Sequence, residues 1–430
     1  MDSVDSVNSV EQAVADAHRR EWAYVLAATV RVTRDLDSAE EAVQDAYVKA
    51  LTTWTRDGVP ERPGAWLTTV ARRNALNMTR RDRTLHAKLP LLVQPDDTEP
   101  SEAFEPSGPS GRDTIPDDRL RLIFTCCHPA LAEEARVALT LRLVCGVATE
   151  DIARAFLVGE SAMAARLTRA KKKIAVARIP YAVPAPGELP RRLDSVLTVV
   201  HLLYATGHTA YSGERLVRDE LTGRALDLAR MLRLLLPGER ETAGLLALLL
   251  AQHARRATRT DAYGTLLRLE EQDRSAWDHE LIAEADRLVV AALTAGPPGR
   301  FTLQAAIAAL HAQAPTYAET DWPQILTLYG ELLRIWPSPV VALNRAVALA
   351  MVDGPSAALA QVEALEAEGR LAGYRYLPAT KADLLHRLGR DTEAVRAYRE
   401  ALALSDNAAE QEFLTGRIRS AGPGARSKPG

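Results

Sequence analysis

Basic side chains are concentrated in residues 160–178, and their spacing gives them a common chemistry. Arg166 and Arg169 lie three residues apart, and Lys171 begins an uninterrupted run of three lysines. On a helix these guanidinium and ammonium groups would share one polar side, which suits electrostatic binding of nucleic-acid phosphates rather than bond-making chemistry. The helix dipole and simple solvation also explain a basic run at a helix C-terminus, and both explanations stay open at this point.

The elements that would position these bases are two short helices in residues 147–174. Ile152 gives the first helix an apolar side, and the small Ala153 allows a partner helix to approach closely. Met163 and Leu167, four residues apart, give the second helix an apolar side that faces back across a turn. The segment therefore predicts a helix-turn-helix whose basic second helix lies in a major groove.

A second set of nitrogen donors follows Pro63 and Gly64, which are expected to begin a helix. Trp66, Val70 and Leu76 are expected to form its apolar stripe, with Trp66 in the core rather than stacked on a base. Donors at this density suit a DNA strand. They are Arg72, Arg73, Asn74, Asn77, Arg80 and Arg81.

An acidic amphipathic helix is predicted upstream, over residues 37–51. Ser38 is the expected N-cap, and Glu41 occupies the capping-box position. Three residues are expected to face inward: Ala42, Ala46 and Leu51. The outer face carries Glu40, Glu41, Gln44 and Asp45. By itself such a face is explained by solvation.

The composition is that of an ordinary globular protein with a local charge asymmetry. The 430 residues are 47% hydrophobic with a net charge of −3, which excludes disordered and nucleic-acid-coating proteins. Residues 135–178, however, hold nine Arg or Lys against three acids, and residues 72–88 hold six against one. Two basic patches predict two contacts with nucleic acid.

Several classes of protein are not expected from this sequence. No segment approaches the about 20 consecutive apolar residues of a membrane span, and the N-terminus lacks the pattern of a signal peptide, so we expect a cytoplasmic protein without membrane contact. Cys126, Cys127 and Cys145 fit a reducing compartment, and no second ligand pair stands at metal spacing from Cys126-Cys127-His128, so no metal is expected. Because no phosphate-binding, metalloprotease or serine-hydrolase motif occurs, we expect no enzyme and no cofactor.

Helical periodicity runs along almost the whole chain and strand signals are nearly absent, so the fold class is predicted to be all-α. A proline-rich, acidic linker is expected over residues 91–118, and a second proline-rich break falls at residues 179–190. The predicted domains are therefore two small helical domains over residues 12–90 and 119–180, and a long extension over residues 188–420. The charge of the linker suggests the hypothesis that it mimics phosphates and occupies a nucleic-acid channel.

The extension carries the periodicity of a tetratricopeptide helix pair. Small residues stand where helices would cross, with a large residue between them and Gly at the turn, in Ala382, Leu385, Gly389, Ala394, Tyr398 and Ala401. A weaker copy lies upstream in Ala346, Leu349, Ala358, Val362 and Leu365. The extension is expected to be an α-solenoid that includes these repeats.

A dense polar cluster precedes these repeats. We expect it to dock the extension against the two small domains or the linker; the alternative is a network of surface ion pairs within the extension. The cluster comprises Arg255, Arg256, Asp261, Gln272, Asp273, Arg274 and Trp277.

Taken together, the motifs are similar to those of one protein family. SAEEAVQDAY, PGAWLTTVARRNALN and EDIARAFLVGESAMAARLTRAKKKI, in this order, resemble the two-domain core of a bacterial extracytoplasmic-function sigma factor of the sigma-70 family. FTCCHPAL, LEEQDRSAWD and PSPVVALNRAVA resemble the group that carries a tetratricopeptide-like C-terminal extension.

The resemblance implies a role for each site. The acidic helix, with Glu40, Glu41, Gln44 and Asp45, would grip the β′ coiled coil of core RNA polymerase, and the second domain would contact the β flap. The donor helix, with Arg72, Arg73, Asn74, Asn77, Arg80 and Arg81, would hold the melted minus-10 element, from which a base is flipped. The helix-turn-helix would face the minus-35 element through Ser161, Arg166, Thr168 and Arg169, with Lys171, Lys172 and Lys173 nearer the phosphates.

One departure from the family affects specificity. Ala164 and Ala165 stand where relatives often carry polar or basic residues, and they offer a thymine methyl contact but no hydrogen bond. The helix-turn-helix is therefore expected to contribute more to positioning the protein on DNA than to selecting the base sequence.

The resulting functional prediction is a sigma factor that binds core RNA polymerase and promoter DNA, initiates DNA-templated transcription and is regulated in cis by its own extension. Two alternatives stay open. One is a DNA-binding regulator that acts without polymerase. The other is a scaffold whose repeats bind a partner protein.

Overall fold

The computed structural model describes residues 2–88, 118–156, 158–209, 212–213, 217–261 and 264–422. Helices form almost all of its regular structure, so the all-α prediction is confirmed; the strands β1 (Ser212–Gly213) and β2 (Asp406–Asn407) form a two-residue parallel pair. Except for Asp118, the predicted acidic linker lies outside the described residues. Among the described helices, none is long and apolar enough to cross a membrane.

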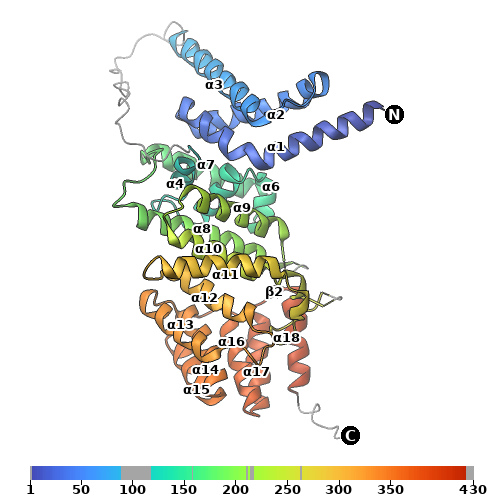
Figure 1. Ribbon diagram of the computed structural model, residues 1–430, viewed down its shortest axis with the longest axis vertical. Coiled ribbons are helices and arrows are strands. Elements are labelled where there is room, and N and C mark those ends of the chain that lie inside the picture. The colour runs from blue at the N-terminus through green and yellow to red at the C-terminus, as the bar shows by residue number, and fades with distance from the viewer. Residues whose placement is uncertain are drawn as a thin grey trace. The chain divides into compact units, whose positions relative to one another are not determined.

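The chain divides into two compact units, Met1–Val199 and Val200–Gly430. The division falls inside α8 (Leu189–His208). The first unit also contains α1 (Asp2–Thr33), α2 (Leu36–Asp57), α3 (Pro63–Lys88), α4 (Asp118–Cys126), α5 (Glu133–Leu139), a π-helix (Thr140–Val144), α6 (Thr149–Phe156) and α7 (Glu160–Val176) (Figure 1).

The second unit is a stack of helices. They are α9 (Asp219–Leu235), α10 (Arg240–His253), α11 (His279–Thr294), α12 (Arg300–Gln313), α13 (Trp322–Ile335), α14 (Pro339–Val352), α15 (Pro355–Ala367), α16 (Tyr376–Arg387), α17 (Asp391–Ala403) and α18 (Ala408–Ser420). Two 3-10 turns, Arg256–Thr258 and Arg274–Ala276, lie between α10 and α11. From α12 onward each helix packs against the next along the chain, which is the arrangement of a solenoid.

The acidic helix begins earlier than its sequence pattern predicts. Asp35, not Ser38, is the N-cap of α2, and its carboxylate accepts a 2.7 Å hydrogen bond from the Ser38 amide. The inward positions Ala42 and Ala46 are fully buried, as expected. The prediction for Leu51 is wrong, because its side chain is 40% exposed. The earlier start reflects the strength of a carboxylate as an acceptor for the unpaired amides of a first helical turn.

The apolar stripe of α3 is shifted from the predicted one. Leu67, Ala71 and Ala75 are fully buried, whereas Leu76 is 49% exposed. Trp66 is half-buried and lies edge-to-face against Trp54, with 5.6 Å between ring centroids. Because α1, α2 and α3 all pack against one another, small alanines fit the crossing better than the large residues on which the prediction rested.

The helix-turn-helix prediction is confirmed in its packing. Ile152, Ala153, Met163 and Leu167 are all buried. The π-helix that precedes α6 closes with a hydrogen bond from the Cys145 amide to the Thr140 carbonyl.

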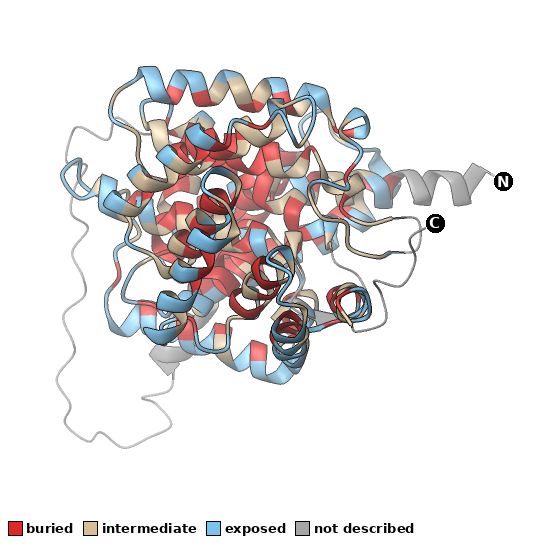
Figure 2. Cartoon of the chain, turned by 90° about the horizontal axis from the view of Figure 1, so that it is seen from below, coloured by how far each residue is buried: buried red, intermediate tan, exposed pale blue. Residues whose placement is uncertain are grey.

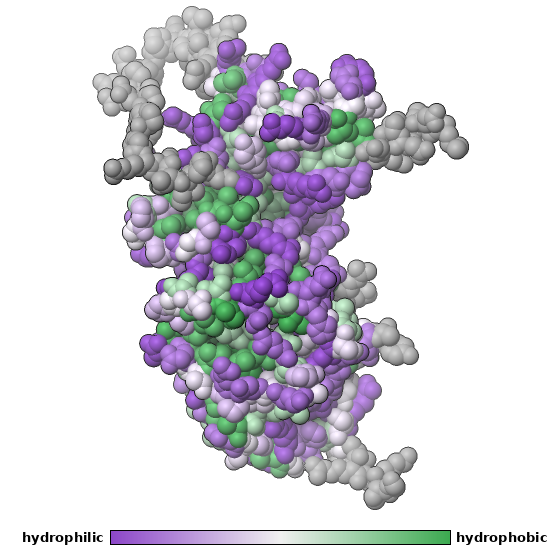
Figure 3. All heavy atoms as spheres, viewed as in Figure 1, coloured by the Kyte–Doolittle hydropathy of each residue, from purple (hydrophilic) through white to green (hydrophobic). Residues whose placement is uncertain are grey.

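The repeat pattern in the extension is also confirmed. Ala382, Ala394 and Ala401 are fully buried between α16, α17 and their neighbours, and Gly389 takes the left-handed conformation (φ 74°) at the turn between those two helices. Buried residues gather on the inward sides of the helices (Figure 2). On the face that Figure 3 shows, apolar and polar residues are interspersed over the surface.

A glycine allows a close helix crossing in the second unit. A Cβ atom on Gly244 of α10 would lie 2.6 Å from the backbone nitrogen of Thr302 on α12. At the same crossing the Glu241 carboxylate accepts hydrogen bonds from the Phe301 and Thr302 amides, at 2.8 and 3.2 Å, and so satisfies the start of α12.

We expect Gly244→Ala to lower the free energy of unfolding of the second unit by about 1–3 kcal/mol, because backbone must move to admit the methyl group. Urea unfolding followed by circular dichroism measures this. The matched control is Gly223→Ala on α9, where a Cβ would meet nothing within 4 Å and where loss of a helical glycine should stabilise by about 0.5–1 kcal/mol. Equal effects of the two substitutions would contradict the crossing geometry.

Several histidines are buried as neutral imidazoles in the second unit. Burial lowers the pKa of His201 and of His311 to about 4, with Arg300 adding to the effect at His201 and Arg255 and Arg274 adding to it at His311. The unfolded chain takes up these protons below about pH 6.5, whereas the folded chain takes them up only near pH 4. Stability is therefore lost as the pH falls through this window.

We expect the loss at pH 5 to be about 2 kcal/mol for each of these two histidines. Calorimetric melting between pH 7 and pH 5 would show it as a falling midpoint. His201→Leu should flatten the pH dependence, while His279→Gln, at an exposed position, should not. A pH dependence unchanged in His201→Leu would contradict the assignment.

Candidate nucleic-acid interface

The basic face of α7 is largely open to solvent. Thr168, Arg169, Lys172 and Lys173 are exposed, as is Ser161 in the first turn. These groups can reach phosphates without rearrangement.

Arg166 is less accessible than its neighbours on α7. Its side chain is half-buried, 3.2 Å from the Glu134 carboxylate and 5.9 Å above the centroid of the Phe156 ring. The Glu134 side chain is itself mostly exposed, so this surface ion pair is weak enough to exchange for a phosphate. Ala164 and Ala165 are exposed on the same helix, as their proposed position on the reading face requires.

The donors on α3 divide into two groups. Arg72, Arg73, Asn77 and Arg80 are exposed along one side of the helix. Asn74 has a structural contact instead, because its amide nitrogen donates a 3.3 Å hydrogen bond to the Ala42 carbonyl of α2. The side chain of Arg81 lies outside the described residues.

The acidic face of α2 is also divided. Glu41, Gln44 and Asp45 are exposed, but Glu40 is only 6% exposed. The Glu40 carboxylate lies 2.5 Å from the Arg142 guanidinium and 2.7 Å from the Lys171 ammonium. The sequence pattern missed this burial, because Glu40 occupies a polar position in the helical periodicity.

Lys171 joins the acidic helix to the helix-turn-helix. Its ammonium lies 2.7 Å from both the Asp37 and the Glu40 carboxylates. Burial acts to lower the pKa of Lys171, but the hydrogen bonds to the two carboxylates outweigh it and the net pKa is raised. Lys171 therefore stays charged, and in this arrangement it neutralises α2 rather than a phosphate.

Neutral contacts surround this ion pair. The Trp22 indole of α1 donates a 3.0 Å hydrogen bond to the Leu143 carbonyl of the π-helix, and the Tyr181 hydroxyl donates one of 2.9 Å to the Ala27 carbonyl. Gly146 (φ 68°) lies so close to Trp22 that a Cβ would be 2.9 Å from its ring. The helices α1–α3 and α4–α7 thus form one compact unit.

Comparison with known families agrees with this division into helical modules. Residues 14–84 match Sigma-70 region 2, residues 121–174 match Sigma-70, region 4, and residues 192–293 match a family of unknown function (DUF6596). An uncharacterized protein of Rhizobium meliloti (strain 1021) is 44% identical over 391 residues, which are 90% of this chain and 91% of that protein. The chain belongs to the extracytoplasmic-function group of the sigma-70 family. No solved structure matches it.

The family assigns the modules of the first unit. Region 2 comprises most of α1–α3 and region 4 comprises α4–α7, so the protein has the two promoter-recognition modules of a sigma factor. A C-terminal helical extension follows them. The chain is thereby a sigma-factor-like protein of transcription initiation.

The polar cluster of the extension has contacts within the second unit. Trp277 and Gln272 are buried. The Trp277 indole donates to the Thr258 hydroxyl at 2.9 Å, and the Arg274 guanidinium donates to the His311 and Ala314 carbonyls at 2.6 and 2.7 Å.

The remaining members of the cluster also have local partners. The Arg256 guanidinium donates to the His253 carbonyl, the Asp261 carboxylate accepts from the Thr265 amide, and Asp273 caps the 3-10 turn through Ser275. Arg255 lines a cavity. Docking of this cluster against the sigma regions stays a prediction.

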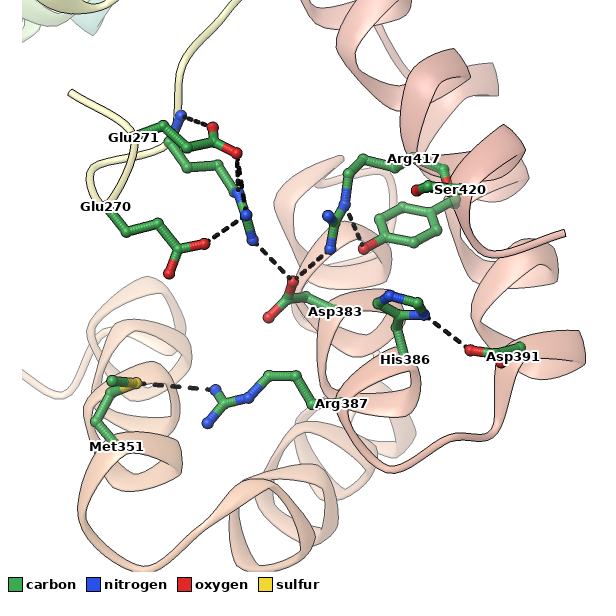
Figure 4. A network of polar contacts seen from close by, with 11 residues as sticks. Glu270, Glu271, Met351, Asp383, His386, Arg387, Asp391, Arg417 and Ser420 are labelled. Atoms are coloured by element: carbon green, nitrogen blue, oxygen red, sulfur yellow. Dashed lines mark hydrogen bonds and ion pairs between the residues drawn. The ribbon is translucent and has the colours of Figure 1, made fainter. Parts of the chain in front are cut away.

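A separate network of ion pairs joins the loop before α11 to the repeats (Figure 4). Arg268 pairs with Glu270 and Glu271, and also lies 3.8 Å from Asp383 on α16. The same Asp383 carboxylate is 3.0 Å from Arg417 of α18. These ion pairs lie within the extension.

Metal binding has no support in the described part of the chain, where no group of three or more His, Cys, Asp or Glu could hold an ion. Burial is the largest cause of raised pKa values for the Cys126 and Cys127 thiols, with that of Cys127 at about 11. These thiols are neutral, as expected for buried apolar positions.

We expect Lys171→Met to lower the free energy of unfolding of the first unit by about 1–3 kcal/mol, since it leaves the Glu40 carboxylate with fewer partners. Glu40→Gln combined with Lys171→Met should be less destabilising than the sum of the two single changes. Urea unfolding of the four proteins measures this coupling. Lys172→Met, at the exposed neighbouring position, is the control, and additive single effects would contradict the ion pair.

Proposed function

We propose that this protein acts as an alternative sigma factor that binds core RNA polymerase and directs it to promoters with minus-10 and minus-35 elements. Glu41, Gln44 and Asp45 on α2 would grip the β′ coiled coil, and region 4 would contact the β flap. The extension would regulate this activity in cis.

The observation that carries the proposal is that region 2 has two surfaces of opposite charge. Exposed acids on α2 stand beside exposed nitrogen donors on α3, of which Arg72, Arg73 and Asn77 are examples. A repressor that used only its helix-turn-helix would need neither surface. An acidic surface complementary to a basic partner favours fast and selective association.

The contacts of Glu40 support a gated mechanism. While Lys171 is bound to Asp37 and Glu40, the Glu40 carboxylate is buried and the Lys171 ammonium is neutralised. This one contact therefore removes Glu40 from the acidic surface of α2 and Lys171 from the basic surface of α7. Polymerase and promoter together would compete with this contact. We therefore propose that regions 2 and 4 separate when the polymerase binds.

Run-off transcription with core RNA polymerase and the full chain tests this proposal. Glu41→Lys with Asp45→Lys should reduce transcription at least tenfold at concentrations of this protein below its Kd for polymerase, where a loss of about 1.4 kcal/mol of binding lowers the bound fraction tenfold. Binding of the variant to duplex DNA should be unchanged. Glu280→Lys, an exposed charge reversal on α11, is the control.

Two results would contradict parts of this proposal. DNA binding without transcription from any candidate promoter would favour a regulator that acts without polymerase. Full activity of the Glu41→Lys, Asp45→Lys protein would remove α2 from the polymerase contact.

Regulation in cis is tested with a shortened chain. The chain should extend to Val199, because Arg192 of α8 donates a 2.8 Å hydrogen bond to the Phe124 carbonyl of α4 and so belongs to the first unit. We expect its transcription to differ from that of the full chain at equal concentration. Equal activity on every promoter would argue against control by the extension.

A further inference from the structure

A cavity of about 280 Å³ lies in the second unit between α10, α12, α13 and α14. Its walls combine apolar side chains, such as Ile307 and Leu332, with convergent polar groups. The polar and aromatic lining includes Gln252, Arg255, Trp277, Gln304, His311 and Asn344. An apolar cavity with a few placed polar groups is the usual form of a small-molecule site, and this one is near the lower end of the about 300–1,000 Å³ range.

Arg255 is the exceptional member of this lining. Its guanidinium has no hydrogen bond or ion pair to any residue that the structure describes, whereas the neighbouring guanidinium of Arg256 donates to the His253 carbonyl, and that of Arg259 to the Thr209 hydroxyl. Burial, together with the positive charge of Arg274, lowers the pKa of Arg255. An arginine remains charged under these conditions, so the fold holds a cation that it does not neutralise.

No other wall group of this cavity carries a charge. The lining contains no Asp or Glu, and His311 is neutral because burial, Arg255 and Arg274 lower its pKa to about 4. Burial raises the pKa of Tyr329, another wall residue, to about 12. Arg255 is therefore the one charged residue among those that line the cavity.

The amide side chains supply additional hydrogen-bonding groups. Gln304 uses its nitrogen on the Arg300 carbonyl, which leaves its oxygen as an acceptor. Within the described chain, Gln252 and Asn344 have no hydrogen-bond partner for their side-chain amides. Asn344 is exposed and so stands at the mouth of the cavity.

We propose that this cavity binds a small organic monocarboxylate with an apolar or aromatic body. The Arg255 guanidinium would hold the carboxylate by two parallel hydrogen bonds, and the body would pack against Trp277, Ile307 and Leu332. A monocarboxylate balances the single charge of the walls.

This site lies wholly within the extension and goes beyond the proposed transcription function. Its test therefore measures binding and requires neither polymerase nor promoter.

The experiment is isothermal titration calorimetry of the full chain with phenylacetate and benzoate, alongside their neutral amides. We expect a carboxylate to bind in a one-to-one ratio and to raise the melting midpoint, and the matching amide to bind at least tenfold more weakly. No binding of either acid at about 10 mM, where even a millimolar Kd gives near-saturation, would overturn the proposal. Equal binding of acid and amide would also overturn it.

Two substitutions assign the binding to this cavity. Arg255→Gln should abolish carboxylate binding, while Arg334→Gln, which removes an exposed guanidinium on α13, should leave it unchanged. Asn344→Asp places a carboxylate at the mouth, where it should compete for Arg255 and weaken binding at least tenfold while the fold is retained. Binding unchanged in both Arg255→Gln and Asn344→Asp would overturn the site. If Arg255→Gln fails to fold, the comparison of acid with amide and the Asn344→Asp protein still test whether the carboxylate binds in this cavity.

Discussion

A carboxylate that is removed from water must be neutralised, and the first unit is organised around one such group, Glu40. Its partners, Arg142 and Lys171, come from region 4, so the same contact joins the two sigma regions. It also makes Glu40 of region 2 and Lys171 of region 4 unavailable to other partners. Buried ion pairs contribute little net stability because desolvation offsets their attraction, although loss of one partner is costly. A contact of this kind suits a closed state that a binding partner can open.

The neutral contacts around the ion pair give this closed arrangement its geometry. The Trp22 indole and the close approach of Gly146 require one particular fit between α1 and the turn before α6. Packing of this kind is sensitive to a single added methyl group, whereas the exposed bases of α3 and α7 tolerate change. Stability and nucleic-acid binding are therefore carried by different residues of the same helices.

The second unit is stabilised in another way. Small residues such as Gly244 and Ala382 let helices cross closely. Polar side chains in the loops form hydrogen bonds with backbone groups, as the Arg274 guanidinium does with the His311 and Ala314 carbonyls. Burial keeps His201 and His311 neutral. The guanidinium of Arg255, which has no hydrogen bond or ion pair to a described residue, is what distinguishes the cavity from an ordinary packing gap.

The sequence by itself determined the all-α class, the helix-turn-helix and the turn at Gly389, because these follow from local periodicity and from backbone conformations that few residues adopt. It also indicated the family, through motifs that are contiguous along the chain. Only the tertiary structure decided that Leu67 rather than Leu76 faces the core and that Glu40 is buried against Lys171. These depend on partners more than a hundred residues away or on which side of a helix its neighbours occupy. The physical reason is that periodicity defines a polar side of a helix, whereas burial and pairing are properties of the space between helices.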